Sequence, residues 1–255
     1  MNGGVAVRVR GLGKLYQIGA PPGSGSAYDR LGRIGGQRGG AYADGHPTVW
    51  ALKDIDLEVP RGHILGVIGR NGSGKSTLMK ILARVTAPTV GSAEILGRVG
   101  ALLQVGAGFH PELSGRDNIA LSGAILGMTR QEIRAVQDQI VAFSEIERFL
   151  DTPVKHYSSG MYLRLAFAVS AHLEAEIMLV DEVLSVGDAT FQAKCLRRIH
   201  ELTADGRTVL FVSHNMESIR ELCDSAVVLH EGELQYAGPA EGAIAHYEGK
   251  ILGIR

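Results

Sequence analysis

The sequence predicts an α/β protein that has a mixed, mainly parallel sheet, an inserted α-helical subdomain and an antiparallel β part. Short apolar runs at His63–Ile68, Glu176–Val180 and Arg207–Val212 alternate with helical segments, which is typical of a parallel sheet covered on both faces. Between the first two runs, residues 114–173 carry apolar side chains at three- and four-residue spacing instead. We therefore expect one domain over residues 1–255, interrupted by a helical block.

Size, charge and cysteine content limit the function classes. A chain of 255 residues can bury one sizeable core. The 26 Lys and Arg residues balance 27 Asp and Glu residues, so nothing indicates a nucleic-acid surface. Cys195 and Cys223 fit no metal-binding spacing and indicate free thiols. No apolar run approaches the ~20 residues that span a bilayer, and no secretory signal is present, so we expect a cytoplasmic protein.

The first part of the chain contains two expected strands and an insert. Val5–Val9 alternates as a strand, and Ala51–Val59 does the same. Between them, Gln17–Pro47 is rich in glycine and lacks the periodicity of a packed element. This insert is either a long functional loop, with a short helix at Tyr28–Ile34, or a disordered excursion.

A phosphate-binding loop follows the strand His63–Ile68. The pattern G-x-x-x-x-G-K-[ST] covers Gly69, Arg70, Asn71, Gly72, Ser73, Gly74, Lys75, Ser76 and Thr77. Glycines allow backbone N–H groups to turn inward around phosphate oxygens, and the helix expected at Ser76–Ala83 adds a favourable dipole. We expect Lys75 to reach the β- and γ-phosphates and Ser76 to bind Mg²⁺, so the sequence predicts ATP and Mg²⁺ as ligands.

The helical block is preceded by an expected hairpin. Ser92–Leu96 and Arg98–Leu103 are interpreted as its strands, with Gly97 at the turn, and Gln104–Leu113 is expected to be a loop. In the block itself, Gly115–Leu126 and Thr129–Phe143 have helical periodicity. Thr129 with Glu132 forms the pattern of a capping box.

Strand–helix alternation returns in the last third of the chain. Asp188 is expected to cap a helix that runs to Leu202. The remaining expected elements are a helix at Met216–Cys223, strands at Ala226–Leu229 and Glu233–Tyr236, and a helix at Pro239–Tyr247.

Two acidic residues end the strand at 176–180. We expect this strand to lie beside the phosphate-loop strand, because carboxyl ends of parallel strands meet at one sheet edge. Asp181 would then bind Mg²⁺, and Glu182 would act as general base toward the attacking water. His214 ends the next strand and is expected near the γ-phosphate, while Gln104 is a further candidate ligand of Mg²⁺.

From Val5 to about Tyr247, the order of these motifs resembles the ATP-binding-cassette (ABC) ATPases. The family's signature motif corresponds to Ser158, Ser159, Gly160 and Met161, and its D-loop to residues 185–188, ending in Asp188. The resemblance implies that the signature of one subunit closes over the ATP of another, which gives a head-to-tail homodimer. It also implies that Tyr16 stacks on adenine.

The sequences of several segments resemble those of one branch of the family, the ATPase subunits of polysaccharide exporters. These segments are VGAGFHPELSGRDNI, YSSGMYLRLAFAVSAHL, DEVLSVGDATFQAKC and VLFVSHNMESIRELCD. This resemblance implies export of a lipid-linked polysaccharide with a separate membrane-spanning permease, at the cytoplasmic face of the inner membrane. Within residues 1–255 we expect no C-terminal carbohydrate-binding domain.

The chain departs from the general family pattern at three positions and leaves two alternatives open. Ser159 and Met161 replace Gly and Gln of the signature, and Val183 replaces the Pro after the catalytic Glu. Gln104 lies about one position from the usual glutamine of the family.

The alternative functions are the ATPase of an importer and a non-transport ABC ATPase, although the balanced charge argues against a nucleic-acid binder.

Overall fold

The fold is described from a computed structural model, which covers residues 4–18, 47–102, 108–181 and 188–253. The candidate residues Gln104 and Glu182, and most of the insert at 17–47, lie outside these ranges. The chain forms two compact units, one of Met1–Leu96 with Val212–Arg255 and one of Gly97–Phe211. Each unit is described by itself.

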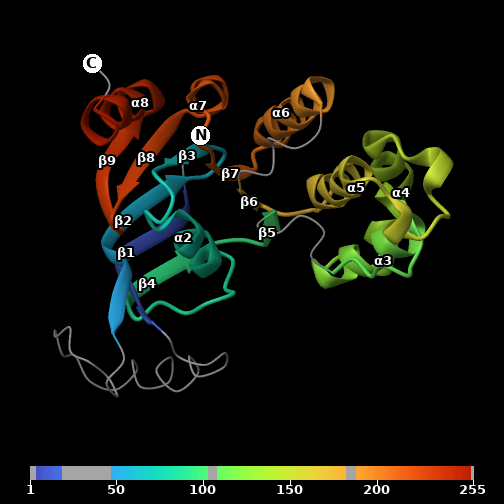
Figure 1. Cartoon of the computed structure of the whole chain (residues 1–255), viewed down its shortest axis with the longest axis horizontal. Coiled ribbons are helices and arrows are strands. Elements are labelled where there is room, and N and C mark those ends of the chain that lie inside the picture. Colours follow the sequence, from blue (N-terminus) through green and yellow to red (C-terminus); the bar gives the residue numbers. More distant parts are fainter. Residues whose placement is uncertain (1–3, 19–46, 103–107, 182–187, 254–255) are drawn as a thin grey trace. The chain divides into compact units, whose positions relative to one another are not determined.

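The first unit contains a three-stranded antiparallel sheet in the order β2-β1-β4 (Figure 1). Its strands are β1 (Val5–Gln17), β2 (Thr48–Pro60) and β4 (Val90–Ile95). Val9 of the central strand pairs with Leu57 on one side and Ala93 on the other. The alternating apolar side chains of β1 and β2 are buried, so the sheet covers the core with one face.

The same unit contains the strand that leads to the phosphate loop. β3 (Ile64–Ile68) pairs in parallel with β8 (Ser225–His230), and β9 (Glu233–Pro239) pairs antiparallel with β8. Every residue of β3 is buried, which explains its continuous apolar sequence. The helices of this unit are α2 (Lys75–Leu82), α7 (Met216–Leu222), α8 (Ala240–His246) and the π-helical turn η4 (Tyr247–Ile251).

The second unit contains a parallel arrangement of strands and a group of helices. β6 (Ile177–Val180) lies between β5 (Val99–Leu102) and β7 (Thr208–Val212), and both pairings are parallel. The helix α6 (Ala189–Ala204) joins β6 to β7, so these three elements form a β-α-β unit. Asp188 caps α6, as the sequence predicted.

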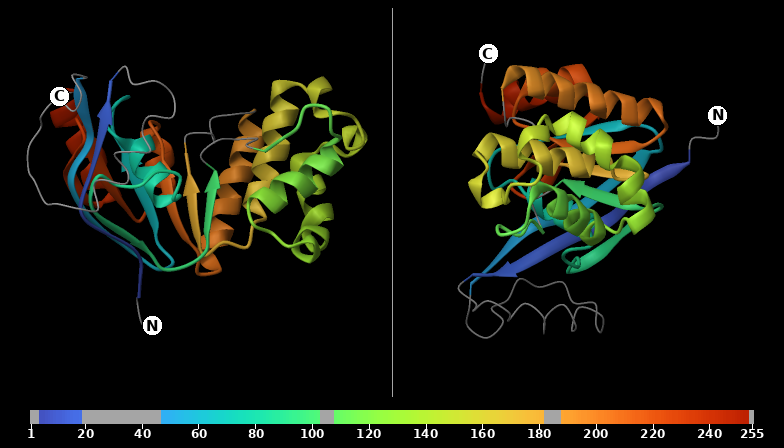
Figure 2. Two further views of the ribbon diagram at one scale, coloured as in Figure 1. Left: turned by 90° about the horizontal axis from the view of Figure 1, so that it is seen from below. Right: turned by 90° about the vertical axis from the view of Figure 1, so that its right-hand side faces the viewer.

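Residues 115–171 of this unit are helical wherever they form regular structure. The elements are α3 (Gly115–Ile125), α4 (Arg130–Ser144), the short 3₁₀ turns η1 (Glu147–Phe149) and η2 (Val154–His156), and α5 (Ser159–Ala171). Figure 2 shows α3, α4 and α5 packed as one group, and the predicted capping box of Thr129 and Glu132 is formed. Rings of Phe143, Phe167 and Phe191, with centroids 5.8–6.2 Å apart, join α4, α5 and α6.

The expected hairpin about Gly97 is wrong. β4 pairs with β1, where Val7 lies opposite Ile95, whereas β5 pairs with β6, where Val99 lies opposite Ile177. The chain therefore enters a different sheet at Gly97. A Cβ at this position would lie 3.0 Å from Glu176 side-chain atoms, so the glycine permits a close approach of chain segments rather than a tight turn.

The expected neighbour of the Asp181 strand is also wrong. β5 and β7 occupy both edges of β6, so the phosphate-loop strand β3 is not its partner. The physical reason is the short crossover through α6, which places the next strand in sequence directly beside β6.

The described helices and the two cysteines can be compared with the expectations of no membrane-spanning segment and of free thiols. Among the helices described, none is both long enough and apolar enough to cross a bilayer. Cys195 and Cys223 are free and buried, and burial raises the pKa of each thiol to about 12. Both thiols are therefore protonated and unreactive at neutral pH.

Candidate functional site

Two glycines of the phosphate loop are required by close backbone contacts. A Cβ at Gly69 would lie 2.4 Å from the carbonyl oxygen of Leu229 and 2.4 Å from Ser73 Oγ. Gly74, which has φ of 107°, would place a Cβ 2.5 Å from the carbonyl oxygen of Ala51. Neither backbone oxygen can move as a side-chain tip can, so the loop has this shape only with glycine at both positions.

The outer side of the loop is open. Gly72 has φ of 81°, and no atom lies within 4 Å of the position that its Cβ would take. Arg70 and Asn71 are exposed next to it. A ligand can therefore reach the loop from this side, where the start of a helix favours an anion.

Polar side chains on the inner side of the loop suit a phosphate and a metal. Lys75 is buried, and its Nζ donates to the carbonyl oxygens of Gly69 at 2.6 Å and Arg70 at 3.0 Å. Ser73 Oγ is buried and has no hydrogen-bond partner among the residues that the structure describes. The Ser76 hydroxyl is exposed at the first turn of α2, and Thr77 follows half-buried. An ammonium, the unpartnered Ser73 hydroxyl and the hydroxyl of the exposed Ser76 fit the β- and γ-phosphates of ATP and Mg²⁺.

The turn between β8 and β9 holds the loop from the other side. The N–H of Gly232 donates to the carbonyl oxygen of Ser73 at 3.1 Å, and its own carbonyl accepts from Lys53 at 2.8 Å. A Cβ at Gly232 would lie 2.9 Å from the carbonyl oxygen of Ala51. Two distant segments, the β8–β9 turn and β2, therefore fix the loop before any ligand is bound.

Tyr16 and His214 lie in the same unit as the phosphate loop. Tyr16 is at the end of β1 with 37% of its surface exposed, and the Nζ of Lys14 lies 5.2 Å from its ring centroid. An exposed ring is available for stacking, which the family resemblance implies. His214 is exposed just after β7, where Asn215 caps α7 through bonds from the N–H groups of Glu217 and Ser218.

The other predicted residues belong to the second unit. Asp181 is half-buried directly after β6, at the carboxyl end of the strand. Ser158 caps the signature helix α5, because its Oγ accepts the N–H of Met161 at 3.2 Å. Ser158 and Ser159 are exposed, and Gly160 is half-buried. The exposed start of a helix offers N–H groups to an anion, as the sequence predicted for the signature.

A group of charged residues around Arg164 was missed from the sequence. Arg164 is the sixth residue of α5 and forms ion pairs with Asp188 and, at 2.7 Å, with Glu145. Lys194 of α6 also contacts Glu145, at 2.9 Å. The pKa of the Asp188 carboxyl lies below its usual value, first because of the N–H of Phe191 and then because of Arg164. The signal available in the sequence was a single charge within the apolar run YLRLAFAV.

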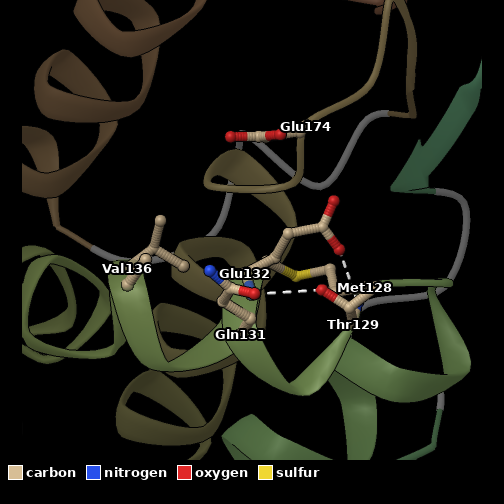
Figure 3. Close-up of a pocket in the computed structure, with 7 residues that line it drawn as sticks. Met128, Thr129, Gln131, Glu132, Val136 and Glu174 are labelled. Atoms are coloured by element: carbon tan, nitrogen blue, oxygen red, sulfur yellow. Dashed lines mark hydrogen bonds between the residues drawn. The ribbon is translucent and has the colours of Figure 1, made fainter.

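The structure also shows a cavity of about 280 Å³, drawn in Figure 3, that contains none of the predicted site residues. It is lined by Met128, Thr129, Gln131, Glu132, Ala135, Val136 and Glu174. The N–H of Glu132 donates to Thr129 Oγ1 at 3.2 Å, and Arg98 Nη1 lies 3.2 Å from the Glu132 carboxylate. Hydrogen bonds from Thr129 are the main reason that the pKa of Glu132 lies below its usual value. This carboxylate is thus engaged in capping α4.

Comparison with known proteins identifies the family. A family described as ABC transporter matches residues 52–185. An O-antigen export system ATP-binding protein (RfbB) of Myxococcus xanthus is 46% identical over 203 residues, which are 80% of this chain and 46% of that protein. A protein of the same name from Klebsiella pneumoniae is 45% identical over 198 residues, 78% of this chain and 80% of that protein.

A solved structure agrees with the fold. It is described as the dimeric structure of a post-hydrolysis state of the ATP-binding cassette MJ0796, bound to ADP and Pi. The likeness has a TM-score of 0.72 at 22% identity and covers 92% of this chain and 98% of that one. The fold class predicted from the sequence is confirmed. The chain therefore belongs to the ABC transporter family, a family of ATP-binding and ATP-hydrolysing proteins.

Proposed function

We propose that this chain is the ATPase subunit of an exporter that moves a lipid-linked polysaccharide across the cytoplasmic membrane, together with a separate membrane-spanning subunit. The substrate class is supported by the O-antigen export relatives, which are 45–46% identical over about four fifths of this chain. The chain spans 46% of the Myxococcus relative, so substrate and partner belong to the proposal. The protein would be located at the cytoplasmic face of the membrane.

The proposed chemistry is hydrolysis of the γ-phosphate. Lys75 would hold the β- and γ-phosphates, while Ser76, Asp181 and Gln104 would bind Mg²⁺, which supplies charge neutralisation of the phosphates when bound. Glu182 would take the proton of the attacking water, and His214 would hydrogen-bond the γ-phosphate oxygen. The observation that carries the phosphate-binding part of this assignment is the buried Lys75 with the unpartnered Ser73 Oγ in a preshaped loop.

The proposed assembly is a head-to-tail homodimer that holds two ATP molecules. The chain has one phosphate loop and one signature, and Ser158 and Ser159 are exposed at the start of α5. A second copy can supply an ATP for this helix start to bind. The related cassette structure is described as dimeric, which supports a dimer.

The proposed route to the membrane subunit uses the helical block at 114–173. Its first helix α3 follows the loop that contains Gln104 in sequence, so a change at the metal would reach the block first. The insert at 17–47 lies mostly outside the described residues. We propose, from the resemblance to the exporter branch, that it faces the membrane subunit.

The test uses the chain co-purified with its membrane subunit in vesicles that contain lipid-linked glycan. Glu182→Gln should keep ATP binding, lower hydrolysis by about 10²–10⁴-fold and stop glycan export. The matched control is Glu174→Gln, an exposed glutamate in the same unit. Turnover near that of the parent would refute the general-base assignment. ATP-dependent movement of a different solute, without glycan export, would refute the substrate class.

A further inference from the structure

One buried side chain fixes the backbone of the loop that precedes α3. Asn118 is fully buried on α3, and its Oδ1 accepts the N–H of His110 at 2.7 Å. Its Nδ2 lies 2.9–3.1 Å from the carbonyl oxygens of three residues, which are His110, Leu113 and Ser114. Because a buried amide must satisfy both its donors and its acceptor, this side chain specifies one conformation of residues 110–114.

The same loop is bound to the residues just before the signature. The N–H of Val154 donates to the carbonyl oxygen of Leu113, and that of Lys155 to the carbonyl oxygen of Pro111, both at 3.0 Å. The Nζ of Lys155 also lies 2.6 Å from the Glu112 carboxylate. Ser114 and Pro153 form an isolated antiparallel bridge. These bonds make loop 110–114 and segment 153–155 a single structural piece.

A direct contact links this piece to the signature helix itself. Phe109 meets Tyr162 edge to face, with ring centroids 5.1 Å apart and an interplanar angle of 67°. Tyr162 is one turn into α5, four residues after Ser158. The helix start is thus approached from both sides, through segment 153–155 along the chain and through Phe109 across space.

We propose that Asn118 is a positioning residue for the signature, acting through loop 110–114 and the adjacent Phe109 to fix the direction in which Ser158–Met161 present their N–H groups. The inference rests on the proposed function, in which these groups bind ATP held by a second copy. A misplacement of about 1 Å can cost roughly 100-fold in rate, so the orientation of the helix start matters even when the helix remains folded. Asn118 would act without touching the nucleotide.

The test removes the three contacts of Asn118 Nδ2 with carbonyl oxygens while keeping the volume of the side chain nearly the same. Asn118→Asp keeps Oδ1 but points a carboxylate oxygen at the carbonyl oxygens that Nδ2 now contacts. The matched control is Ser144→Ala, because Ser144 is also fully buried in this helical block and donates to the carbonyl oxygen of Val141 at 2.9 Å. Both changes are made in the full chain that carries Glu182→Gln, so that bound ATP persists.

Two readouts separate positioning from stability and from the dimer itself. Hydrogen exchange at the backbone N–H groups of 158–162 should be about tenfold faster in Asn118→Asp and unchanged in Ser144→Ala. The ATP concentration that half-saturates dimer formation should rise about tenfold, while the affinity of the dilute monomer for a fluorescent ATP analogue stays within about twofold. Equal behaviour of Asn118→Asp and Ser144→Ala would overturn the proposal, as would an equal loss of monomer affinity.

The exchange measurement keeps the inference independent of the dimer. If the Glu182→Gln parent stays monomeric with ATP, the proposed assembly fails, and faster exchange at 158–162 still supports the role of Asn118. Unchanged exchange in that case would refute the role of Asn118 as well.

A covalent substitute provides the rescue. Paired residues of an antiparallel bridge have Cα atoms about 4.5–5.5 Å apart, which a disulfide can span. Ser114→Cys with Pro153→Cys, added to Asn118→Asp, should restore slow exchange when oxidised and lose it when reduced. The native Cys195 and Cys223 are buried and will not interfere. An oxidised protein that exchanges as fast as the reduced one would contradict the proposal.

A second variant covers the case in which Asn118→Asp does not fold. Phe109→Leu removes the ring contact with Tyr162 but keeps an apolar side chain. Its control is Phe149→Leu, since Phe149 is 48% exposed in the same block. Faster exchange at 158–162 in Phe109→Leu alone supports the inference, and equal exchange in the two variants refutes it.

Discussion

Arg164 of the signature helix forms an ion pair with Asp188 at the start of α6, although 24 residues separate them in the chain. Asp188 has a second bond, because its Oδ1 accepts the N–H of Phe191 at 2.9 Å and so caps α6. One carboxylate therefore joins α5 to the start of α6.

The two bonds of Asp188 can be separated by substitution. Asp188→Asn retains a good helix cap and loses only the ion pair, whereas Asp188→Ala loses both. We expect a Tm decrease of roughly 2–4 °C for the alanine variant beyond that of the asparagine variant. Calorimetry checks this, with Asp205→Ala at the other end of α6 as control. Equal Tm values for the two Asp188 variants would show that the cap contributes nothing.

Gly69 and Gly72 should respond very differently to alanine. A Cβ at Gly69 meets the Leu229 carbonyl oxygen at 2.4 Å, while Gly72 faces open space and is strained only by its φ of 81°. Gly72→Ala should therefore cost about 1–2 kcal/mol of stability. Gly69→Ala should cost more and should also abolish binding of an ATP analogue. Urea unfolding and nucleotide titration measure both effects. A Gly69→Ala protein that binds nucleotide normally would contradict the described loop geometry.

Lys75 should contribute to nucleotide affinity rather than to turnover alone. Its Nζ is held by the carbonyl oxygens of Gly69 and Arg70, so the ammonium is in place before the phosphates arrive. Hydrogen bonds to charged groups contribute about 1.5–3 kcal/mol, so Lys75→Ala should weaken ATP-analogue binding by roughly 10–100-fold. Lys80→Ala, an exposed lysine on the same helix, is the control. Equal affinities in a fluorescence titration would place the phosphates elsewhere.

His172 should make stability depend on pH below neutrality. Burial lowers the pKa of its imidazole below the ordinary 6.5, although Nδ1 lies 2.7 Å from the carbonyl oxygen of Ala168. The unfolded chain then binds a proton more readily than the folded one. The contribution of neutral His172 to the free energy of unfolding is complete above pH 6.5. It is lost as the pH falls below that value and through the lowered pKa.

Asparagine at position 172 should remove this dependence. His172→Asn can place its amide nitrogen where Nδ1 lies, and it does not titrate. We expect the Tm of the parent to fall more steeply than that of the variant between pH 7 and the acid range. His200→Asn, on the exposed side of α6, should behave like the parent. Parallel Tm curves for parent and His172→Asn would remove His172 from the pH response.

Most elements of this fold were predictable from the sequence because their signals are local. The continuous apolar runs of β3, β6 and β7, the capping box at Thr129 and the cap at Asp188 all depend on residues close in the chain. The partners of strands are not local. β4 and β5 flank Gly97 as a hairpin would, but their neighbours are set by packing of strands far away in the sequence.

The candidate site shows the same division. The phosphate loop can be predicted from its own glycines and lysine, which are close together in the chain. In the structure, Gly69 and Gly74 have the close contacts that require glycine. The role of Arg164 could not be predicted, because its partners Glu145 and Asp188 lie 19 and 24 residues away on other elements. The supporting contacts of a site depend on tertiary packing, and a motif does not encode them.

The bond from Gly232 to the phosphate loop has a consequence for biosynthesis. Leu229 lies against Gly69 of the loop, and the N–H of Gly232 donates to the carbonyl oxygen of Ser73 in the loop. Leu229 and Gly232 are more than 150 residues after the loop in the chain. A nascent chain that ends before β8 lacks this support, even though all of Gly69–Thr77 has already left the ribosome. We therefore expect tight binding of nucleotide only after β8 and β9 are in place, so that ATP stabilises the finished subunit and not a half-made one.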